Sequence, residues 1–247
     1  MKRILSLLLV VSCVCIFGCS KGIKKEETAE DMFAKAQAHY DKRQYVYAIE
    51  VLNKIKEKFP KSPLIPDVEL LGADSLFKQG KYADALQAYQ EFFQIHPTHP
   101  KMPYASYQEA LCYFEQKTTP DRDQTSTEKA LKKFQFLMTQ FPESEYASLA
   151  KDKMAVLRNL LAEHEFVVGD FYLRKKKYNA ALKRFVGIME RYPEARIADR
   201  VLFSIGKLYL ETGDHELAKT TFQQLSRHFK ESEYILKAEE ILKDRGM

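Results

Sequence analysis

Apolar residues recur at helical spacing in two blocks between positions 68 and 97, and a glycine separates the blocks. The blocks comprise Leu71, Leu76 and Phe77 before Gly80, and Ala85, Leu86, Tyr89, Phe92 and Phe93 after it. Intervals of three and four residues place such side chains on one face of a helix. Gly80 supplies the permissive backbone of a tight turn, and Pro97 ends the second helix. The stretch predicts a helical hairpin, which cannot bury its apolar face alone.

The hairpin pattern occurs five times in one register. The second helices carry Ala48, Ala85, Ala130, Ala181 and Ala218, followed twelve residues later by Pro60, Pro97, Pro142, Pro193 and Lys230. Twelve residues before the alanine, four copies have the small residues Ala36, Ala73, Gly169 and Gly206. Small, aromatic and proline positions of this kind define the tetratricopeptide repeat, a helix-turn-helix unit of about 34 residues. Stacked copies share a core, so we expect an all-α, right-handed solenoid of five hairpins.

An insertion interrupts the third repeat. Its small residue, Ala110, lies twenty residues before Ala130 instead of twelve. The inserted segment is polar and contains Pro120, which predicts a surface loop with Thr125 or Ser126 capping the next helix. The loop centre is Asp121, Arg122 and Asp123, whose alternating charges favour a local ion-pair cluster.

The interval between Pro142 and Pro193, which end the second helices of repeats 3 and 4, is also long. No proline or glycine occurs from Tyr146 until Gly169. One helix of about thirty residues, roughly 45 Å long, fits this interval. It would divide N-terminal repeats 1–3 (residues 28–143) from C-terminal repeats 4–5 (residues 144–247). Residues 232–244 predict a final amphipathic capping helix.

The first residues are typical of an exported lipoprotein. An apolar run at 4–17 follows two basic residues and ends at Cys19 in a segment that resembles a bacterial lipobox. We expect residues 1–18 to be a signal peptide, Cys19 to carry the lipid, and residues 19–27 to form a flexible tether. Ser20 resembles a signal for delivery to the outer membrane. An ordinary secreted protein cleaved elsewhere is the alternative.

Charge and cysteine content narrow the function further. Without Lys2 and Arg3 the chain has 37 basic and 34 acidic residues, so its net charge is near balance. It also has no long block of one charge sign, and nucleic-acid binding is therefore not indicated. The densest basic cluster, residues 174–177, lies at a predicted helix C-terminus, where cations complement the helix dipole. A phosphate or lipid head-group site there is the alternative. After export and lipidation only Cys112 remains, and its apolar neighbours favour a buried small residue over a reactive thiol.

An enzyme site is not apparent in the sequence. His96 and His99 flank Pro97 without the carboxylates or cysteines that would complete a metal site. Nucleophile motifs, phosphate loops and glycine-rich fingerprints are also missing. We expect no catalysis, no metal, and no cofactor other than the covalent lipid on Cys19.

Segments outside the repeat pattern resemble the BamD family, the tetratricopeptide lipoproteins of the outer-membrane β-barrel assembly machine. They are His96-Pro97-Thr98-His99-Pro100 with Tyr104, Asp121-Arg122-Asp123, and residues 141–146 and 161–193. The resemblance covers essentially all of the mature chain. It implies a non-enzymatic scaffold, held by lipid on the periplasmic face of the outer membrane with other Bam lipoproteins. Another periplasmic tetratricopeptide adaptor, coordinating cell-wall synthesis, is the alternative.

The resemblance also implies site residues. Members of the family dock their C-terminal repeats on the last POTRA domain of BamA, and Arg184 matches the family's arginine at that contact. The loop residues Asp121, Arg122 and Asp123 are expected to contact partners as well. The N-terminal repeats would receive C-terminal segments of unfolded outer-membrane proteins. The groove candidates are His39, Tyr40, Phe77 and Tyr107.

Overall fold

The computed structural model describes residues 26–247, and in this part of the chain it contains eleven α-helices. They are α2 (Ala29–Asp41), α3 (Tyr45–Lys58), α4 (Ile65–Lys78), α5 (Tyr82–Ile95), α6 (Met102–Glu115), α7 (Thr125–Gln140), α8 (Glu145–Arg174), α9 (Tyr178–Arg191), α10 (Ala198–Thr212), α11 (His215–His228) and α12 (Tyr234–Asp244). The predicted signal peptide and the lipidation site Cys19 lie outside the described residues.

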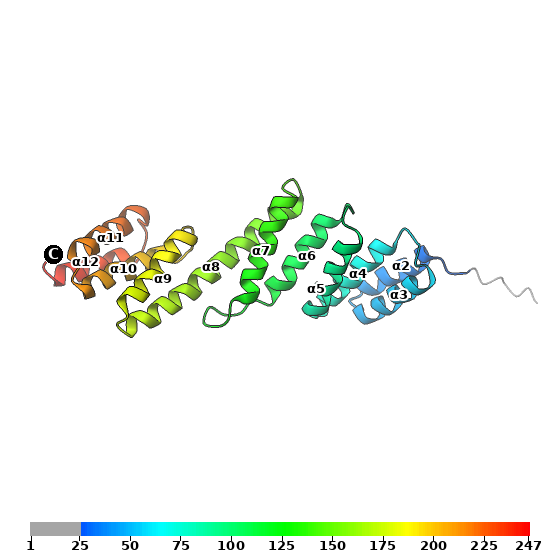
Figure 1. The fold of residues 1–247 in the computed structure, drawn as a ribbon, viewed down its shortest axis with the longest axis horizontal. Helices are drawn as coiled ribbons and strands as arrows, with labels where there is room; N and C mark the ends of the chain where they lie inside the picture. The colour runs from blue at the N-terminus through cyan, green and yellow to red at the C-terminus, as the bar shows by residue number, and fades with distance from the viewer. Residues whose placement is uncertain (1–25) are drawn as a thin grey trace, which may run out of the picture.

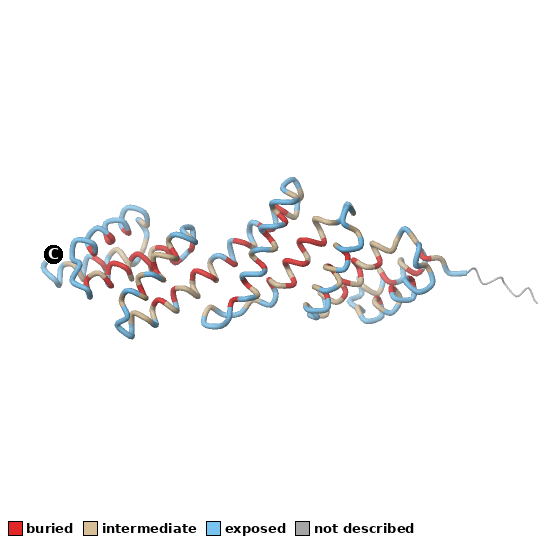
Figure 2. Tube along the Cα trace, viewed as in Figure 1, coloured by how far each residue is buried: buried red, intermediate tan, exposed pale blue. Residues whose placement is uncertain are grey.

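Consecutive helices pair into five hairpins, from α2–α3 to α10–α11, and α12 covers the last one. The hairpins stack side by side into an elongated molecule (Figure 1). Buried residues run through the interior from one hairpin to the next, so the core is shared along the stack (Figure 2). The predicted helical-hairpin solenoid is confirmed.

Small residues allow the two helices of each hairpin to cross closely. The five second-helix alanines, from Ala48 to Ala218, are all fully buried. A Cβ atom on Gly206 would lie 2.3 Å from the Phe222 ring, and one on Gly169 would lie 2.6 Å from the Phe185 ring. The small positions found in the sequence are therefore required by ring packing from the opposite helix.

The long helix α8 has 30 residues, and its two halves pack in different cores. Met154 and Leu157 pack in the core around α6 and α7. Ala162 and Phe166 pack in the core around α9 and α10. Ser144 caps the helix by accepting a hydrogen bond from the Tyr146 backbone N–H at 3.1 Å. The predicted continuous helix with two packing roles is confirmed.

The insertion in hairpin 3 is a surface loop, but its capping differs from the prediction. Thr125 is the first residue of α7, and its backbone N–H and hydroxyl both donate to the Asp123 carboxylate, at 3.0 and 3.1 Å. The expected cap by Thr125 or Ser126 is wrong because the preceding aspartate supplies the acceptor. The expected ion-pair cluster is also wrong, since none of the salt bridges among the described residues involves Arg122.

The turns within hairpins 1, 2, 4 and 5 each contain one residue in the left-handed region. Glycine occupies two of these positions, Gly80 and Gly213, whereas Arg43 has φ 59° and Lys176 has φ 53°. A side chain strains this backbone conformation, and glycine does not.

Arg43→Gly is expected to raise the free energy of unfolding by about 0.5 to 1 kcal/mol, because relief of left-handed strain outweighs the added freedom of the unfolded chain. Urea denaturation of the two proteins measures the difference. The matched control is Lys42→Gly, whose φ of −80° carries no such strain and which should lose stability. Equal effects at the two positions would contradict the prediction.

Candidate functional site

A hollow of about 300 Å³ opens beside α2, α4 and α6, the first helices of hairpins 1 to 3. We call it the tyrosine hollow. Its lining residues are Phe33, Gln37, Asp67, Leu70, Leu71, Asp74, Lys101, Tyr104 and Tyr146. The Tyr104 and Tyr146 rings meet edge to face, 5.6 Å apart, and the Lys101 ammonium pairs with Asp67 at 2.7 Å. The hollow therefore combines aromatic walls with charged groups, a composition suited to an extended peptide.

Asp74 organises the polar part of the tyrosine hollow. Tyr89 from α5 donates to one carboxylate oxygen at 2.5 Å, and Tyr104 from α6 donates to the other at 2.7 Å. Burial raises the pKa of Asp74, and the two hydroxyl donors offset this only in part. Burial and the neighbouring Asp74 charge likewise raise the pKa of Tyr104. The carboxylate thus links three helices from two hairpins.

None of the four predicted groove residues is among the residues that line the tyrosine hollow. The His39 Nδ1 atom lies at hydrogen-bond distance, 2.8 Å, from the Gln44 side-chain oxygen in the hairpin 1 turn. The Phe77 ring packs on the Tyr82 ring. Tyr40 is half-buried, and burial raises its pKa to about 12. Tyr107 is 9% exposed and lies between Phe134 and Tyr146. Their role in binding stays a prediction.

A second charged site, the arginine cluster, joins α8 to α9. Glu165 on α8 accepts from Arg184 at 2.8 Å through one oxygen and from Arg191 at 2.9 Å through the other. Burial alone would raise the pKa of Glu165, but hydrogen bonds from both guanidinium groups outweigh it and hold that pKa below its ordinary value. Two arginines on one carboxylate leave a surplus positive charge. The Arg184 side chain is 43% exposed, so it keeps donors available to another carboxylate.

A hollow of about 610 Å³ lies beside this cluster, between α7, α8 and the α9–α10 connection. Met138, Met154 and Tyr192 contribute apolar surface. The cations at its edge are Lys151, Arg158 and Arg191. An acidic partner segment with an apolar side chain would complement it.

The loop residues predicted to bind partners are exposed and locally ordered. Asp121, Arg122 and Asp123 are all exposed. A Thr119 hydrogen bond holds the pKa of Asp121 below its ordinary value, and hydrogen bonds from Thr125 do the same for Asp123. His164 on α8 lies 2.6 Å from the Pro120 carbonyl oxygen, which fixes the loop to the long helix. The structure brings this loop near α8 but not into the arginine cluster.

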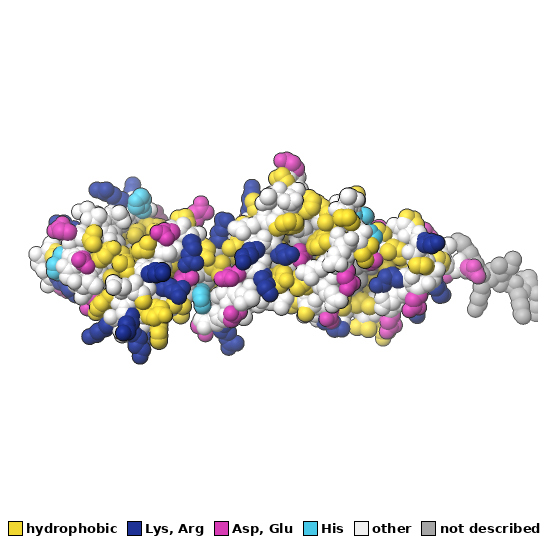
Figure 3. All heavy atoms as spheres, in the orientation of Figure 1, with side chains coloured by type: hydrophobic (Ala, Val, Ile, Leu, Met, Phe, Trp, Pro, Cys, Tyr) yellow, Lys and Arg dark blue, Asp and Glu magenta, His cyan; other side chains and the backbone are white. Residues whose placement is uncertain are grey.

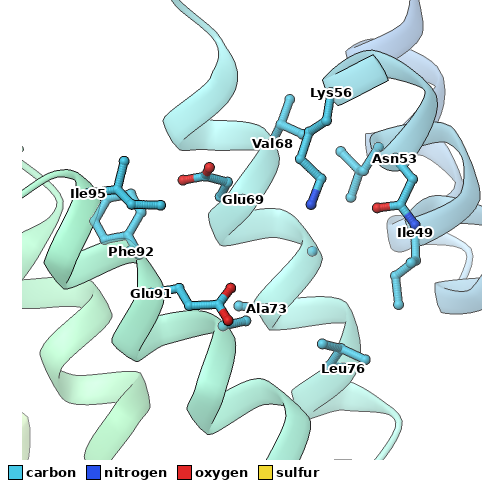
Figure 4. Close-up of a pocket in the computed structure, with 13 residues that line it drawn as sticks. Ile49, Asn53, Lys56, Val68, Glu69, Ala73, Leu76, Glu91, Phe92 and Ile95 are labelled. Carbon is cyan, nitrogen blue, oxygen red and sulfur yellow. The ribbon is translucent and has the colours of Figure 1, made fainter. Parts of the chain in front are cut away.

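A third, smaller hollow of about 140 Å³ lies between α3, α4 and α5. Figure 4 shows Lys56 and Glu91 reaching into it from different helices, with Ile49 and Leu76 at its edge. Gly72 contributes to the lining and has no atom nearer than 4.0 Å to the place of a Cβ. The space in front of this glycine is open.

Three buried or half-buried acidic residues with partners on other helices were not identified from the sequence: Asp74, Glu109 and Glu165. Glu109 is 2% exposed and pairs with Lys133 at 2.7 Å. Each is a single acid within a predicted helix, and its partners come from other helices. The only sequence signal is an acidic residue within a largely apolar helical run, as in residues 68–77.

Other chemistry is limited in the described part of the chain. Residues 26–247 contain no group of three or more histidine, cysteine or acidic side chains that could hold a metal ion. Cys112 is fully buried, as predicted, and burial raises its pKa to about 12. None of the helices described is long and apolar enough to cross a membrane.

Comparison with known families agrees with this architecture. The model of the family described as YfiO, outer membrane lipoprotein, matches residues 25–225. The chain belongs to the YfiO family. The match extends through the first four hairpins and into α11 of the fifth.

Individual relatives are similar to the chain over nearly all of its length. The outer membrane protein assembly factor BamD of Rickettsia prowazekii is 29% identical, with 99% of this chain and 98% of the relative covered. The BamD of Caulobacter vibrioides is 27% identical, covering 96% of this chain and 80% of that protein. The predicted resemblance to BamD is confirmed.

Solved structures support the fold. The TPR2AB domain of yeast Sti1, solved as a complex with pHSP90, has a TM-score of 0.50 and 15% sequence identity. The alignment covers 87% of this chain and 84% of the Sti1 chain. At this identity the similarity shows the tetratricopeptide fold alone.

Proposed function

We propose that the chain is a non-enzymatic scaffold of the outer-membrane β-barrel assembly machine, anchored through lipid on Cys19 at the periplasmic face of the outer membrane. The observation that carries this proposal is the family match over residues 25–225, with BamD relatives aligned along nearly the whole chain. An elongated solenoid with two separate candidate binding surfaces suits a scaffold. In this proposed role the protein needs no cofactor besides its covalent lipid.

The arginine cluster is the proposed docking site for the last POTRA domain of BamA. Its surplus positive charge and the exposed Arg184 suit a carboxylate on the partner, which a guanidinium binds with two parallel hydrogen bonds. Glu165 holds Arg184 in place before the partner arrives, and this reduces the entropy lost on binding. Other Bam lipoproteins are expected to contact remaining surfaces, including the loop at 121–123.

The tyrosine hollow is the proposed site for C-terminal segments of unfolded outer-membrane proteins. Such a segment is extended, so its side chains alternate and an aromatic one can enter the hollow and pack against Tyr104 and Tyr146. Asp74 fixes the Tyr104 ring by accepting a hydrogen bond from its hydroxyl. Lys101 is exposed at the edge and can pair with a carboxylate of the segment.

Gentle detergent extraction of the tagged full-length protein from its native envelope tests the proposed function. Recovery of a β-barrel protein with POTRA domains in near-equal amount is the expected result. Recovery of cell-wall enzymes without any barrel protein would favour the alternative adaptor function and overturn the proposal.

Arg184→Ala is expected to weaken association with the barrel protein about tenfold, or about 1.4 kcal/mol. Glu165 keeps its bond to Arg191, so the melting temperature should change little. Binding is measured by titration with the isolated POTRA domains, and circular dichroism measures melting. The control is Lys183→Ala, an exposed neighbour on the same helix that forms no salt bridge within the described chain. Equal loss of binding in the two variants would contradict the role of Arg184.

A further inference from the structure

The connection between α8 and α9 projects from one end of a hairpin and carries the densest group of cations. Lys175, Lys176 and Lys177 follow Arg174 directly, and all four are exposed. Figure 3 shows dark-blue side chains gathered with hydrophobic atoms at the lower edge of the molecule, over the α8–α9 turn of Figure 1. This end of the hairpin is therefore a basic and partly apolar tip.

The three lysines of the turn are not neutralised within the described chain. Arg174 pairs with Asp170 at 3.1 Å, which uses the acidic residue on the same turn of helix. The salt bridges formed among residues 26–247 include none with Lys175, Lys176 or Lys177. Their charge remains available to a partner outside the molecule.

Local backbone preference does not explain the lysine at position 176. Its N–H donates to the Leu173 carbonyl in the same pattern that Gly80 and Gly213 show in hairpins 2 and 5. Lys176 has φ 53°, in the left-handed region that favours glycine. The position thus holds a cation where the fold would accept glycine with less strain.

Apolar side chains lie beside these cations. Phe171 is 50% exposed and Val167 is 39% exposed. They are four residues apart on α8 and so share one face of the helix. The Lys175 ammonium lies 6.0 Å from the Phe171 ring. Exposed aromatic and aliphatic side chains flanked by lysines are typical of surfaces that enter the head-group region of a membrane.

We propose that this turn patch, comprising Val167, Phe171, Lys175, Lys176 and Lys177, binds the surface of an anionic phospholipid membrane. Each lysine near such a surface strengthens binding about fivefold, and Phe171 adds apolar burial. A projecting tip fits a flat bilayer. The family is described as outer membrane lipoprotein, so a membrane surface lies close to the protein. A protein already tethered to that membrane needs only weak additional contacts to keep the patch on its surface.

The position of the patch gives the contact a structural consequence. The first described residues lie at one end of the elongated molecule, and the α8–α9 turn lies near the other (Figure 1). Attachment through both places would lay the solenoid along the membrane. This inference rests on the proposed lipid anchor but not on the proposed role in barrel assembly.

A tryptophan reporter tests the patch, because the chain contains no tryptophan. Phe171→Trp is made in the full-length lipoprotein, which is reconstituted into brominated phosphatidylcholine vesicles with or without phosphatidylglycerol. Bromine quenches tryptophan that enters the bilayer. We expect quenching to rise about twofold in the anionic vesicles and to be lost when Lys175→Glu and Lys177→Glu are added. Circular dichroism checks that each variant is folded.

The matched control is Phe136→Trp on α7, since Phe136 is 53% exposed and so resembles Phe171 in accessibility. Its quenching should not respond to lipid charge. Equal responses of the two reporters to lipid charge would overturn the proposal. So would quenching of the Phe171→Trp protein that changes neither with lipid charge nor with the lysine substitutions. Burial of the Phe171→Trp side chain seen only in native envelopes, and not in pure lipid vesicles, would assign the patch to a protein partner. That result would also overturn the proposal.

Discussion

Asp74→Ala is expected to lower the free energy of unfolding by about 2 to 3 kcal/mol, because it removes the acceptor of two tyrosine hydroxyls. Tyr89 is fully buried, so its hydroxyl would be left without a partner in a dry environment. Tyr104 would lose the contact that fixes its ring at the tyrosine hollow. Urea denaturation measures the loss, and binding of an aromatic-ended peptide measures the effect on the hollow.

Asp74→Asn is the matched control, because it keeps an acceptor oxygen and removes the buried charge. The folded pKa of Asp74 is raised above its ordinary value of 3.8, so the folded state holds the proton more tightly than the unfolded state does. The stabilisation is present below pH 3.8 and is lost as pH rises through the folded pKa. The stability of the native protein relative to Asp74→Asn should therefore fall as the pH rises above 3.8. A constant difference would contradict the raised pKa.

The hairpins were predictable because their signals are local. A helix brings residues three and four apart to one face, and the alanine that contacts the facing helix recurs in every repeat. Ala48 and Ala85 therefore identify equivalent crossings without knowledge of the whole fold, and both are fully buried. The 30-residue helix α8 followed from the same reasoning, since nothing in residues 146–168 would end it.

The polar sites depend on which side chains of different helices meet, both within a hairpin and between hairpins, and the sequence carries no comparable signal for that. Asp74 meets partners fifteen and thirty residues away, and Arg184 meets Glu165 nineteen residues away. Repeat spacing determines neither the rotation between neighbouring hairpins nor which polar side chains of facing helices meet, so these contacts could not be paired in advance. Arg184 was identified through resemblance to a family, and its intramolecular partner emerged only from the structure.

Gly206→Ala is expected to lower the free energy of unfolding by about 1 to 3 kcal/mol, although alanine favours helix over glycine. The new methyl group would meet three atoms of the Phe222 ring, the nearest at 2.3 Å. Phe222 is 3% exposed and stacks near Phe203, so its ring has no free space to enter. Hairpin 5 should open first, and hydrogen exchange of α10 and α11 measures where protection is lost.

Gly72→Ala in α4 is the control for this prediction and should have the opposite sign. Its methyl group would meet nothing nearer than Leu52 at 4.0 Å, because it enters the hollow between α3 and α5. The higher helix propensity of alanine should then raise the free energy of unfolding by up to about 1 kcal/mol. Stabilisation in both variants would show that the α10–α11 crossing relaxes easily. Opposite signs would establish that the glycine of the tetratricopeptide register serves ring packing, whereas Gly72 serves no packing role within the chain.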